Sequence, residues 1–476
     1  MKKLVSIESV MSTSGVRFGT SGARGLVSAM TDEVCYAYAL AFLQAVAADA
    51  KTIVLGHDLR PSSPRIVAAC AAAIEATGRQ VIYAGALPTP ALAFYAEQIG
   101  APAIVVTGSH IPFDRNGIKF YRADGEISKV DELAIAQAQV EVPSIIVLTE
   151  LPLPDVRVGQ TYVQRYVDFF GTSALAGAKV AVYEHSSVAR DILRVIFEGL
   201  GATVISLGRA EVFVPIDTEA VRAEDVAQAK LWAQQQQFDM LVSTDGDADR
   251  PLIGDETGVW LRGDVAGILC AQFLQADVVV TPVSSNTAVE KCGAFAQVIR
   301  TRIGSPYVIA GMESAVANGA VVGYEANGGF LLGSKIVRNG RSLAALPTRD
   351  AVLPMLALLC LARERACPVS KLAEMLPARF SASDRIQNFA TERSAALLAQ
   401  LLVSPYFLAE TLAPNAGAIS HIDQTDGLRA TFENGDIVHL RPSGNAPELR
   451  CYAESNSADL AKSLCEACLA KLVRLD

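Results

Sequence analysis

The segment TIVLGHDLRPSSPRIVAACAAAIEATGRQVIYAG, residues 52–85, contains a strand–helix–strand pattern that recurs along the chain. An apolar strand leads through the turn residues RPSSP into an alanine-rich helical stretch, and a second apolar strand follows. The same order returns twice, and each copy is followed later by a third apolar strand. The further copies begin at KVAVYEHSS and DVVVTPVSSN, and the third strands are AIVVTGSH, FDMLVSTDGD and GAVVGYEANGG. The sequence therefore predicts three βαβ-type units, and the helix of the last one is expected over TAVEKCGAFA, residues 287–296.

Strands that alternate with helices in this way predict parallel or mixed sheets that are covered on both faces. Beyond about Pro377 the pattern changes, because residues 427–444 indicate a hairpin around Asn434-Gly435, followed by a strand and a closing helix. We therefore predict an α/β fold with three similar α/β domains with mixed sheets and a smaller C-terminal α+β domain around a central cleft. The expected domain boundaries are residues 1–152, 153–257, 258–372 and 373–476.

The composition narrows the class of protein. Hydrophobic residues make up 51% of the 476 residues and charged residues 19%, which is typical of a well-packed soluble chain. The formal charge of -9 argues against a nucleic-acid or anionic-membrane surface. No apolar run approaches the roughly 18 residues of a membrane helix, and the first fifteen residues have too short an apolar core for a signal peptide. We expect a cytoplasmic protein without nucleic-acid or membrane partners.

The loop STDGDADRPLI places Asp245, Asp247 and Asp249 at alternate positions after an apolar strand. Carboxylates at this spacing repel one another, and a divalent cation relieves the repulsion by taking their oxygens as ligands. A calcium-binding EF-hand fits less well, because Arg250 occupies the position that must be glycine and the preceding segment is not helical. A polar turn without metal remains the other alternative.

Another strand ends at the serine and histidine of TGSH, residues 107–110, and this pair suits either a turn or a nucleophile with its helper. RPSGNAPE, residues 441–448, suits a phosphate seat and a plain turn equally well. GYEANGGF, residues 323–330, carries a carboxylate and an amide that can bind sugar hydroxyls, or it is also a turn. FGTSGARG, residues 18–25, misses the nucleophile-elbow pattern at Ala23 and is better interpreted as a glycine-rich loop presenting Arg24. The chain contains no P-loop pattern, so an ordinary nucleotide kinase is disfavoured.

Five of these loops together carry a resemblance. GTSGARG, TGSHIPFDRNGIKF, DGDADR, GYEANGG and RPSGNAPE, in this order over nearly the whole chain, resemble the α-D-phosphohexomutase family. The fold of that family, three similar α/β domains and a fourth of another type around a central cleft, agrees with the repeats.

The resemblance implies a mechanism for these residues. Ser109 would be carried as a phosphoserine that donates its phosphoryl group to a sugar monophosphate and recovers the other phosphoryl group of the resulting bisphosphate. Mg²⁺ would be bound by Ser109 and the three aspartates, Asp245, Asp247 and Asp249. The further roles would be catalysis by His110, Lys119, Arg24 and Arg250; sugar binding by Glu325 and Asn327; and phosphate binding by Arg441, Ser443, Gly444, Asn445 and Arg450.

The chain also departs from the family pattern. Ile111 stands where many relatives have asparagine, and Ser305 stands where hexose-phosphate enzymes often have histidine. The sugar loop Glu325-Ala326-Asn327 lacks the usual serine and histidine, and Asn445-Ala446 replaces the usual Thr-Glu. All but the first of these differences fall in loops expected to contact substrate.

We predict a Mg²⁺-dependent phosphomannomutase that acts on small-molecule sugar phosphates, with glucose 1,6-bisphosphate or mannose 1,6-bisphosphate as activator and a monomeric or dimeric state. Phosphoglucomutase and phosphoglucosamine or acetylglucosamine mutase are the nearest alternatives. A haloacid-dehalogenase-like phosphatase with Asp245 as nucleophile, and a catalytically silent phosphosugar-binding protein, are the alternatives from other classes.

Overall fold

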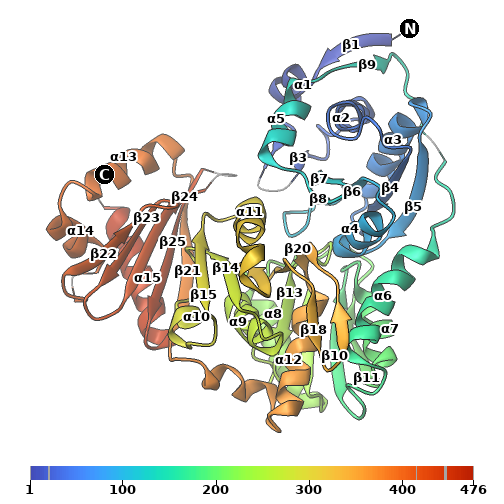
Figure 1. Cartoon of the computed structure of the whole chain (residues 1–476). Coiled ribbons are helices and arrows are strands. Elements are labelled where there is room, and N and C mark those ends of the chain that lie inside the picture. The colour runs from blue at the N-terminus through green and yellow to red at the C-terminus, as the bar shows by residue number, and fades with distance from the viewer. Residues whose placement is uncertain (1, 20–21, 149, 414, 444–446, 475–476) are drawn as a thin grey trace.

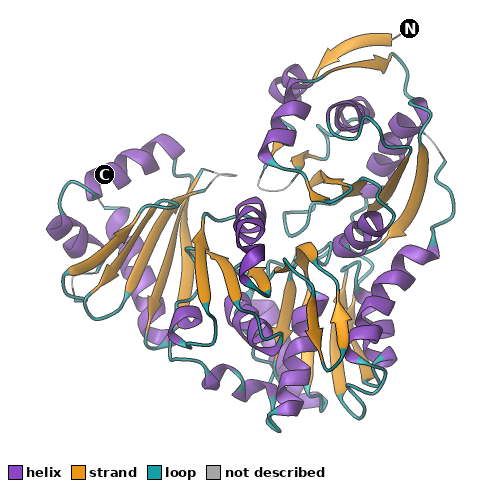
Figure 2. Ribbon diagram, in the orientation of Figure 1, coloured by secondary structure: helices purple, strands orange, loops and turns teal. Residues whose placement is uncertain are grey.

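The computed structural model describes residues 2–19, 22–148, 150–413, 415–443 and 447–474. Figure 1 shows four units that follow one another along an arc, with the N-terminal and C-terminal units at its two ends. Each unit is built around its own sheet, and Figure 2 shows helices packed against these sheets. The predicted α/β class with mixed sheets is confirmed.

The first unit contains a seven-stranded sheet in the order β2-β3-β7-β6-β4-β5, with β8 paired to β7, and a separate pair of strands, β1 and β9. Its strands are β1 (Lys2–Ser6), β2 (Arg17–Phe18), β3 (Ala23–Leu26), β4 (Thr52–His57), β5 (Gln80–Ala86), β6 (Ala103–Val106), β7 (Arg115–Arg122), β8 (Gly125–Glu126) and β9 (Gln139–Pro143). Its helices are α1 (Ile7–Ser14), α2 (Asp32–Ala45), α3 (Ser63–Ala76), α4 (Thr89–Gln98) and α5 (Lys129–Gln137).

The second unit contains a four-stranded sheet in the order β11-β10-β12-β13. Its elements are α6 (Val156–Phe170), β10 (Lys179–His185), α7 (Arg190–Gly199), β11 (Thr203–Arg209), α8 (Ala223–Gln235), β12 (Met240–Thr244) and β13 (Pro251–Gly254).

The third unit contains a five-stranded sheet in the order β15-β14-β16-β17-β20 and the hairpin β18-β19. Its strands are β14 (Val278–Pro282), β15 (Gln297–Thr301), β16 (Val321–Tyr324), β17 (Phe330–Leu332), β18 (Ile336–Arg338), β19 (Arg341–Leu343) and β20 (Leu346–Asp350). Its helices are α9 (Gly263–Phe273), α10 (Ala288–Lys291), α11 (Ser305–Ala315), η1 (Val316–Asn318), α12 (Val352–Glu364), η2 (Val369–Lys371) and η3 (Ala373–Met375). The helix expected over residues 287–296 is wrong in length, because Gly293 adopts φ +63° directly after the short α10 and ends it.

The three sheets repeat one arrangement. The first strand of each repeat, β4, β10 or β14, pairs in parallel with the next strand on one side and with the third strand on the other. The third strand, β6, β12 or β16, then pairs antiparallel with the strand that follows it. The loops after these third strands therefore lie at equivalent edges of three sheets, and they carry the serine, the three aspartates and the Glu325-Asn327 pair.

The fourth unit contains a five-stranded antiparallel sheet in the order β21-β25-β24-β23-β22. Its elements are β21 (Phe380–Gln387), α13 (Thr391–Leu401), α14 (Pro405–Leu412), β22 (Ile419–Asp423), β23 (Leu428–Phe432), β24 (Ile437–Pro442), β25 (Glu448–Ser455) and α15 (Ala458–Leu472). The hairpin predicted around Asn434-Gly435 is confirmed, because β23 and β24 pair across it.

The apolar cores show how the units are joined. One continuous cluster of buried side chains runs through the second and third units and also includes Ala91 and Phe94 of α4 in the first unit. The fourth unit has a core of its own, to which Leu401 and Leu408 belong. Within the described part of the chain, no single helix is long and apolar enough to cross a membrane; only α13 and α14 together, bent by 118° at their break, reach that length and composition.

Candidate active site

The loop after β6 holds Ser109 in a fixed and buried position. The residue is 0% exposed and its backbone adopts φ +52°, a left-handed conformation that is uncommon for a residue other than glycine. Its amide donates a 2.8 Å hydrogen bond to Thr107 Oγ1, and its hydroxyl donates a 2.5 Å hydrogen bond to Asp245 Oδ2. His110 Nδ1 lies 3.2 Å from the same hydroxyl. The serine of the first unit therefore contacts the acidic loop of the second.

Arg60 anchors the loop that carries Ser109, and the sequence analysis did not identify this arginine. The guanidinium donates hydrogen bonds to four backbone carbonyls of the loop and of its return to β7, at 2.5 to 2.9 Å. It is 1% exposed, pairs with Asp58 at 3.2 Å and lies 4.2 Å from the ring of Phe213 of the second unit. Gly108 is required here, because a Cβ at this position would lie 2.5 Å from Arg60 Cζ. The only signal in the sequence was an Asp-x-Arg at the end of the first repeated strand.

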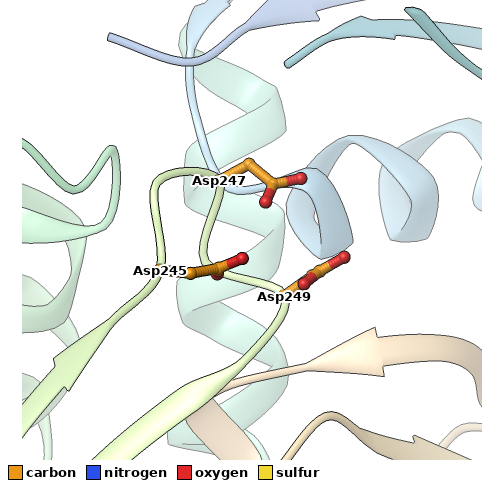
Figure 3. A group of neighbouring side chains, drawn as sticks. All are labelled: Asp245, Asp247 and Asp249. Carbon is orange, nitrogen blue, oxygen red and sulfur yellow. The ribbon is translucent and has the colours of Figure 1, made fainter. Parts of the chain in front are cut away.

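The three aspartates of the loop between β12 and β13 form a buried cluster. Asp245, Asp247 and Asp249 are each at most 1% exposed, and one oxygen of each lies within 4.8 Å of the others. Figure 3 shows the three side chains projecting from this one short loop. Burial, and then the charges of Asp249 and Asp247, raise the pKa of Asp245 well above its usual 3.8. The three carboxylates therefore repel one another when no metal ion is bound.

The residues of this cluster fit a divalent cation. Among the residues that the structure describes, Asp247 Oδ1 and Asp249 Oδ1 are buried and have no hydrogen-bond partner. Buried carboxylate oxygens without donors are costly, and hard cations such as Mg²⁺ bind oxygen ligands. The loop therefore forms a site able to hold a metal ion.

Three cationic side chains partly balance the aspartates, and one of them, Arg250, lies 3.6 Å from Asp249 Oδ1 through its Nε. Lys119 Nζ, on β7, donates hydrogen bonds to Asp247 Oδ2 and Asp249 Oδ2, both at 2.7 Å. Burial lowers the pKa of Lys119, but the two carboxylates outweigh burial and raise it above 10.5. Arg349, at the end of β20, donates to Asp249 Oδ2 at 2.8 Å and to Glu325 Oε2 at 3.2 Å. Sequence reasoning missed Arg349, because TRD in an apolar segment carries no recognisable motif.

A cavity of about 230 Å³ lies beside this buried cluster and is lined by all four units. Of the predicted site residues, those in its lining are Arg24, His110, Arg250, Glu325, Asn327, Arg441, Ser443 and Arg450. Gly444 and Asn445 lie outside the described residues. Ser109, Lys119 and the aspartates are not in the lining and lie in the buried layer, which contacts the lining through Arg349 and His110.

The cavity is rich in arginine. Besides the predicted arginines, Arg349 and Arg385 line it, and so do the carboxylates of Asp217, Glu219 and Asp384, none of which the sequence analysis had singled out. Burial, followed by the charges of Arg250 and Arg349, lowers the pKa of Arg24 to about 10. Burial and neighbouring arginines also hold the pKa of His110 well below its usual 6.5, so that its imidazole is neutral. Such a pocket favours an anionic ligand, despite the negative charge of the whole chain.

Two of the residues noted as departures have structural roles. Ser305 Oγ donates to Glu126 Oε2 at 3.1 Å and so joins the third unit to the first. Ile111 contributes its backbone carbonyl to the Arg60 contacts. Asn445 and Ala446 lie outside the described residues.

A buried serine in contact with a candidate cation site, beside an arginine-lined cavity between four units, is the arrangement that a metal-dependent phosphoryl-transfer enzyme requires. Comparison with known proteins specifies the family. Residues 15–141, 160–258 and 262–380 match alpha/beta/alpha domains I, II and III of phosphoglucomutase/phosphomannomutase, and residues 377–471 match its C-terminal domain. The chain belongs to the phosphoglucomutase/phosphomannomutase family, which confirms the predicted resemblance.

Individual relatives agree with this assignment. A phosphomannomutase of Salmonella muenchen is 46% identical over 477 residues, covering 99% of this chain and 98% of the relative. A phosphoglucosamine mutase of Desulfovibrio desulfuricans is 30% identical and covers 75% of this chain and 81% of the relative. The solved structure of a phosphoglucomutase/phosphomannomutase family protein from Burkholderia thailandensis superimposes with a TM-score of 0.74 at 19% identity, covering 97% of each chain, and so supports the four-unit fold.

Proposed function

We propose that this chain is a phosphomannomutase, which interconverts mannose 6-phosphate and mannose 1-phosphate. The observation that carries the proposal is the 2.5 Å contact between Ser109 Oγ and Asp245 in a cation site, beside an arginine-lined cavity. The choice of mannose is supported by the 46% identity to a phosphomannomutase, against 30% to a phosphoglucosamine mutase. The proposed domains are residues 1–152, 153–257, 258–372 and 373–476.

In the proposed reaction, Ser109 carries a phosphoryl group. A free hydroxyl of the sugar monophosphate attacks the phosphorus; the new oxygen–phosphorus bond forms as the bond to Ser109 Oγ breaks. The sugar bisphosphate then turns in the cavity and returns its other phosphoryl group to Ser109, which leaves the phosphate on the opposite sugar carbon. Mannose 1,6-bisphosphate or glucose 1,6-bisphosphate, added as activator, would phosphorylate Ser109 in chains that lack the group.

The charges of the site suit this transfer. Phosphoryl transfer proceeds through a loose transition state, so alignment and neutralisation of charge dominate catalysis. Mg²⁺ bound by Asp245, Asp247 and Asp249 would withdraw charge from the phosphoserine. We assign to Arg24 and Arg250 the bracing of the transferring group, because both line the cavity.

The remaining roles follow from position. Lys119 would accept the proton of the attacking hydroxyl only when Asp247 and Asp249 are engaged by the metal ion, because these two carboxylates otherwise keep its Nζ protonated. His110, which lies 3.2 Å from Ser109 Oγ, would be its helper. Glu325 and Asn327 would bind the sugar hydroxyls. The phosphate that does not react would sit at Arg441, Ser443 and Arg450, together with Gly444 and Asn445.

The proposal is tested with purified protein, Mg²⁺ and a bisphosphate activator. Coupled assays with mannose 1-phosphate, glucose 1-phosphate and glucosamine 1-phosphate should show the highest kcat/KM for the mannose compound. A Ser109→Ala variant should lose activity, and mapping of residues 104–125 in the wild-type protein should place the phosphate on Ser109. Full activity of the alanine variant would instead favour a phosphatase with Asp245 as nucleophile. Binding of these sugar phosphates without turnover would indicate a silent binding protein.

A further inference from the structure

The third and fourth units meet at a small polar contact on the rim of the cavity. The third unit contributes the loop of residues 302–304, between β15 and α11, and the fourth contributes the turn of residues 424–427, between β22 and β23. Arg302 Nε donates a 3.1 Å hydrogen bond to the carbonyl of Thr425, and the amide of Ile303 donates a 2.9 Å hydrogen bond to Asp426 Oδ2. The core of the fourth unit is separate. This contact therefore acts together with those of Asn286 and Thr287 to Arg379, Ser381 and Glu454 in fixing the position of the fourth unit relative to the cavity.

The same carboxylate oxygen also contacts an arginine of the cavity. Asp426 Oδ2 lies 3.0 Å from Nε of Arg441, and both side chains are 18% exposed. Ile303 and Arg441 both line the cavity. The shortest contact of Asp426 is to Nε rather than to the two terminal amino groups, which are the donors that bind phosphate in pairs. One carboxylate therefore orients the guanidinium and connects it to another unit.

The turn that carries Asp426 is held firmly. Gly427 adopts φ +86°, and a Cβ there would lie 2.3 Å from the carbonyl oxygen of Leu440, so the turn packs directly on β24. His439 Nε2 lies 2.6 Å from the carbonyl oxygen of Asp426. Burial lowers the pKa of His439 to about 4, so the ring is neutral near pH 7 and donates its Nε2–H to this carbonyl. The backbone that carries this carboxylate is therefore held by packing against β24 and by the hydrogen bond from His439.

We propose that Asp426 is a positioning residue that holds the Arg441 guanidinium next to Ile303 of the third unit. The phosphate-binding site around Arg441 is then correctly placed only while the fourth unit contacts the third. The proposal rests on the proposed function, in which Arg441 binds the phosphate that does not react. Asp426 does not touch the reacting atoms in this scheme. Its loss is therefore expected to weaken substrate binding and to leave the transfer step nearly unchanged.

The test compares KM and kcat for mannose 1-phosphate in four variants. Asp426→Asn removes the charge that pairs with Arg441 but keeps an oxygen for the Ile303 amide, and we expect KM to rise about fivefold, the loss of about 1 kcal/mol typical of an ion pair that is partly open to solvent. The kcat should stay within about threefold of the wild-type value. Arg302→Ala is the matched control, because it removes an interdomain hydrogen bond and leaves the Asp426–Arg441 pair; its KM should change by less than about threefold.

The Arg441→Ala variant and the double variant complete a thermodynamic cycle. If Asp426 acts through Arg441, the Asn substitution should add no further increase in KM once Arg441 is absent. An undiminished effect in the Arg441→Ala background, a wild-type KM in Asp426→Asn, or a loss confined to kcat would each overturn the proposal. Calorimetric binding of mannose 1-phosphate gives the same comparison without turnover. A wild-type protein that binds but does not convert any of the sugar phosphates contradicts the proposed function, whereas an active wild type with an unaffected Asp426→Asn variant contradicts only the role of Asp426.

Discussion

Gly108→Ala gives the sharpest test of how the serine loop is held. The new Cβ would lie 2.5 Å from both Cζ and Nε of Arg60, whereas ordinary contacts begin at 3.4 Å, so the guanidinium has to move by about 0.9 Å. The backbone of Gly108 does not adopt a positive φ, so the substitution tests this contact alone. A shift of that size breaks at least two of the four hydrogen bonds from Arg60 to backbone carbonyls. At about 1.5 kcal/mol for each bond from a charged donor, we expect a loss of about 3 kcal/mol in the free energy of unfolding.

Activity should fall as well, because the loop carries Ser109. A displacement of about 1 Å at a reacting group can cost about 100-fold in rate, and we expect a loss of that size in kcat with mannose 1-phosphate. The assays are thermal unfolding by calorimetry and steady-state kinetics. Gly159→Ala in α6 is the matched control, because its Cβ meets nothing closer than 3.7 Å, and it should be neutral or stabilising by up to about 1 kcal/mol.

The Arg60→Ala background decides whether the reasoning is correct. Without the guanidinium, Gly108→Ala should cost less than about 0.5 kcal/mol more, because the group that it displaces is gone. Wild-type stability and kcat in the single Gly108→Ala variant would refute the argument, and so would a full additional loss in the Arg60→Ala background.

The remaining predictions concern charge. Asp245→Asn should raise the melting temperature in EDTA, because one of three mutually repelling carboxylates is removed. The same variant should lose most of the stabilisation that added Mg²⁺ gives the wild-type protein. Calorimetry with and without Mg²⁺ measures both effects. Arg349→Met should destabilise the protein by about 3 kcal/mol in chemical unfolding, because it removes the buried ion-pair partner of Glu325 and one of the cations that pair with Asp249. Burial lowers the pKa of His439 from 6.5 to about 4, so its neutral form contributes stability that is complete above pH 6.5 and is lost as the pH falls toward 4. His439→Gln should remove up to about 3 kcal/mol of this acid sensitivity, as measured by unfolding between pH 7 and pH 4.

The repeats and the local motifs were accessible from the sequence. In strands and helices the apolar residues recur at short, regular spacings along the sequence. Residues 52–85 and their two copies therefore revealed the class of fold. Asp245, Asp247 and Asp249 lie within five residues on one loop, and their mutual repulsion is a local property that predicts a cation site. The resemblance then placed a candidate nucleophile at Ser109.

Which of these groups contact one another depends on the packing of the four units. The hydroxyl of Ser109 contacts Asp245 across 136 positions of the chain, and no spacing rule encodes that contact. Arg60 and Arg349 had no motif of their own, because a buried arginine gains its role from the carbonyls and carboxylates that packing brings around it. The link from Ile303 through Asp426 to Arg441 likewise exists only because two separately folded units are docked. The secondary structure follows from the local geometry of the backbone and is therefore encoded in short segments of sequence. The site depends on contacts between four units that pack around one cavity.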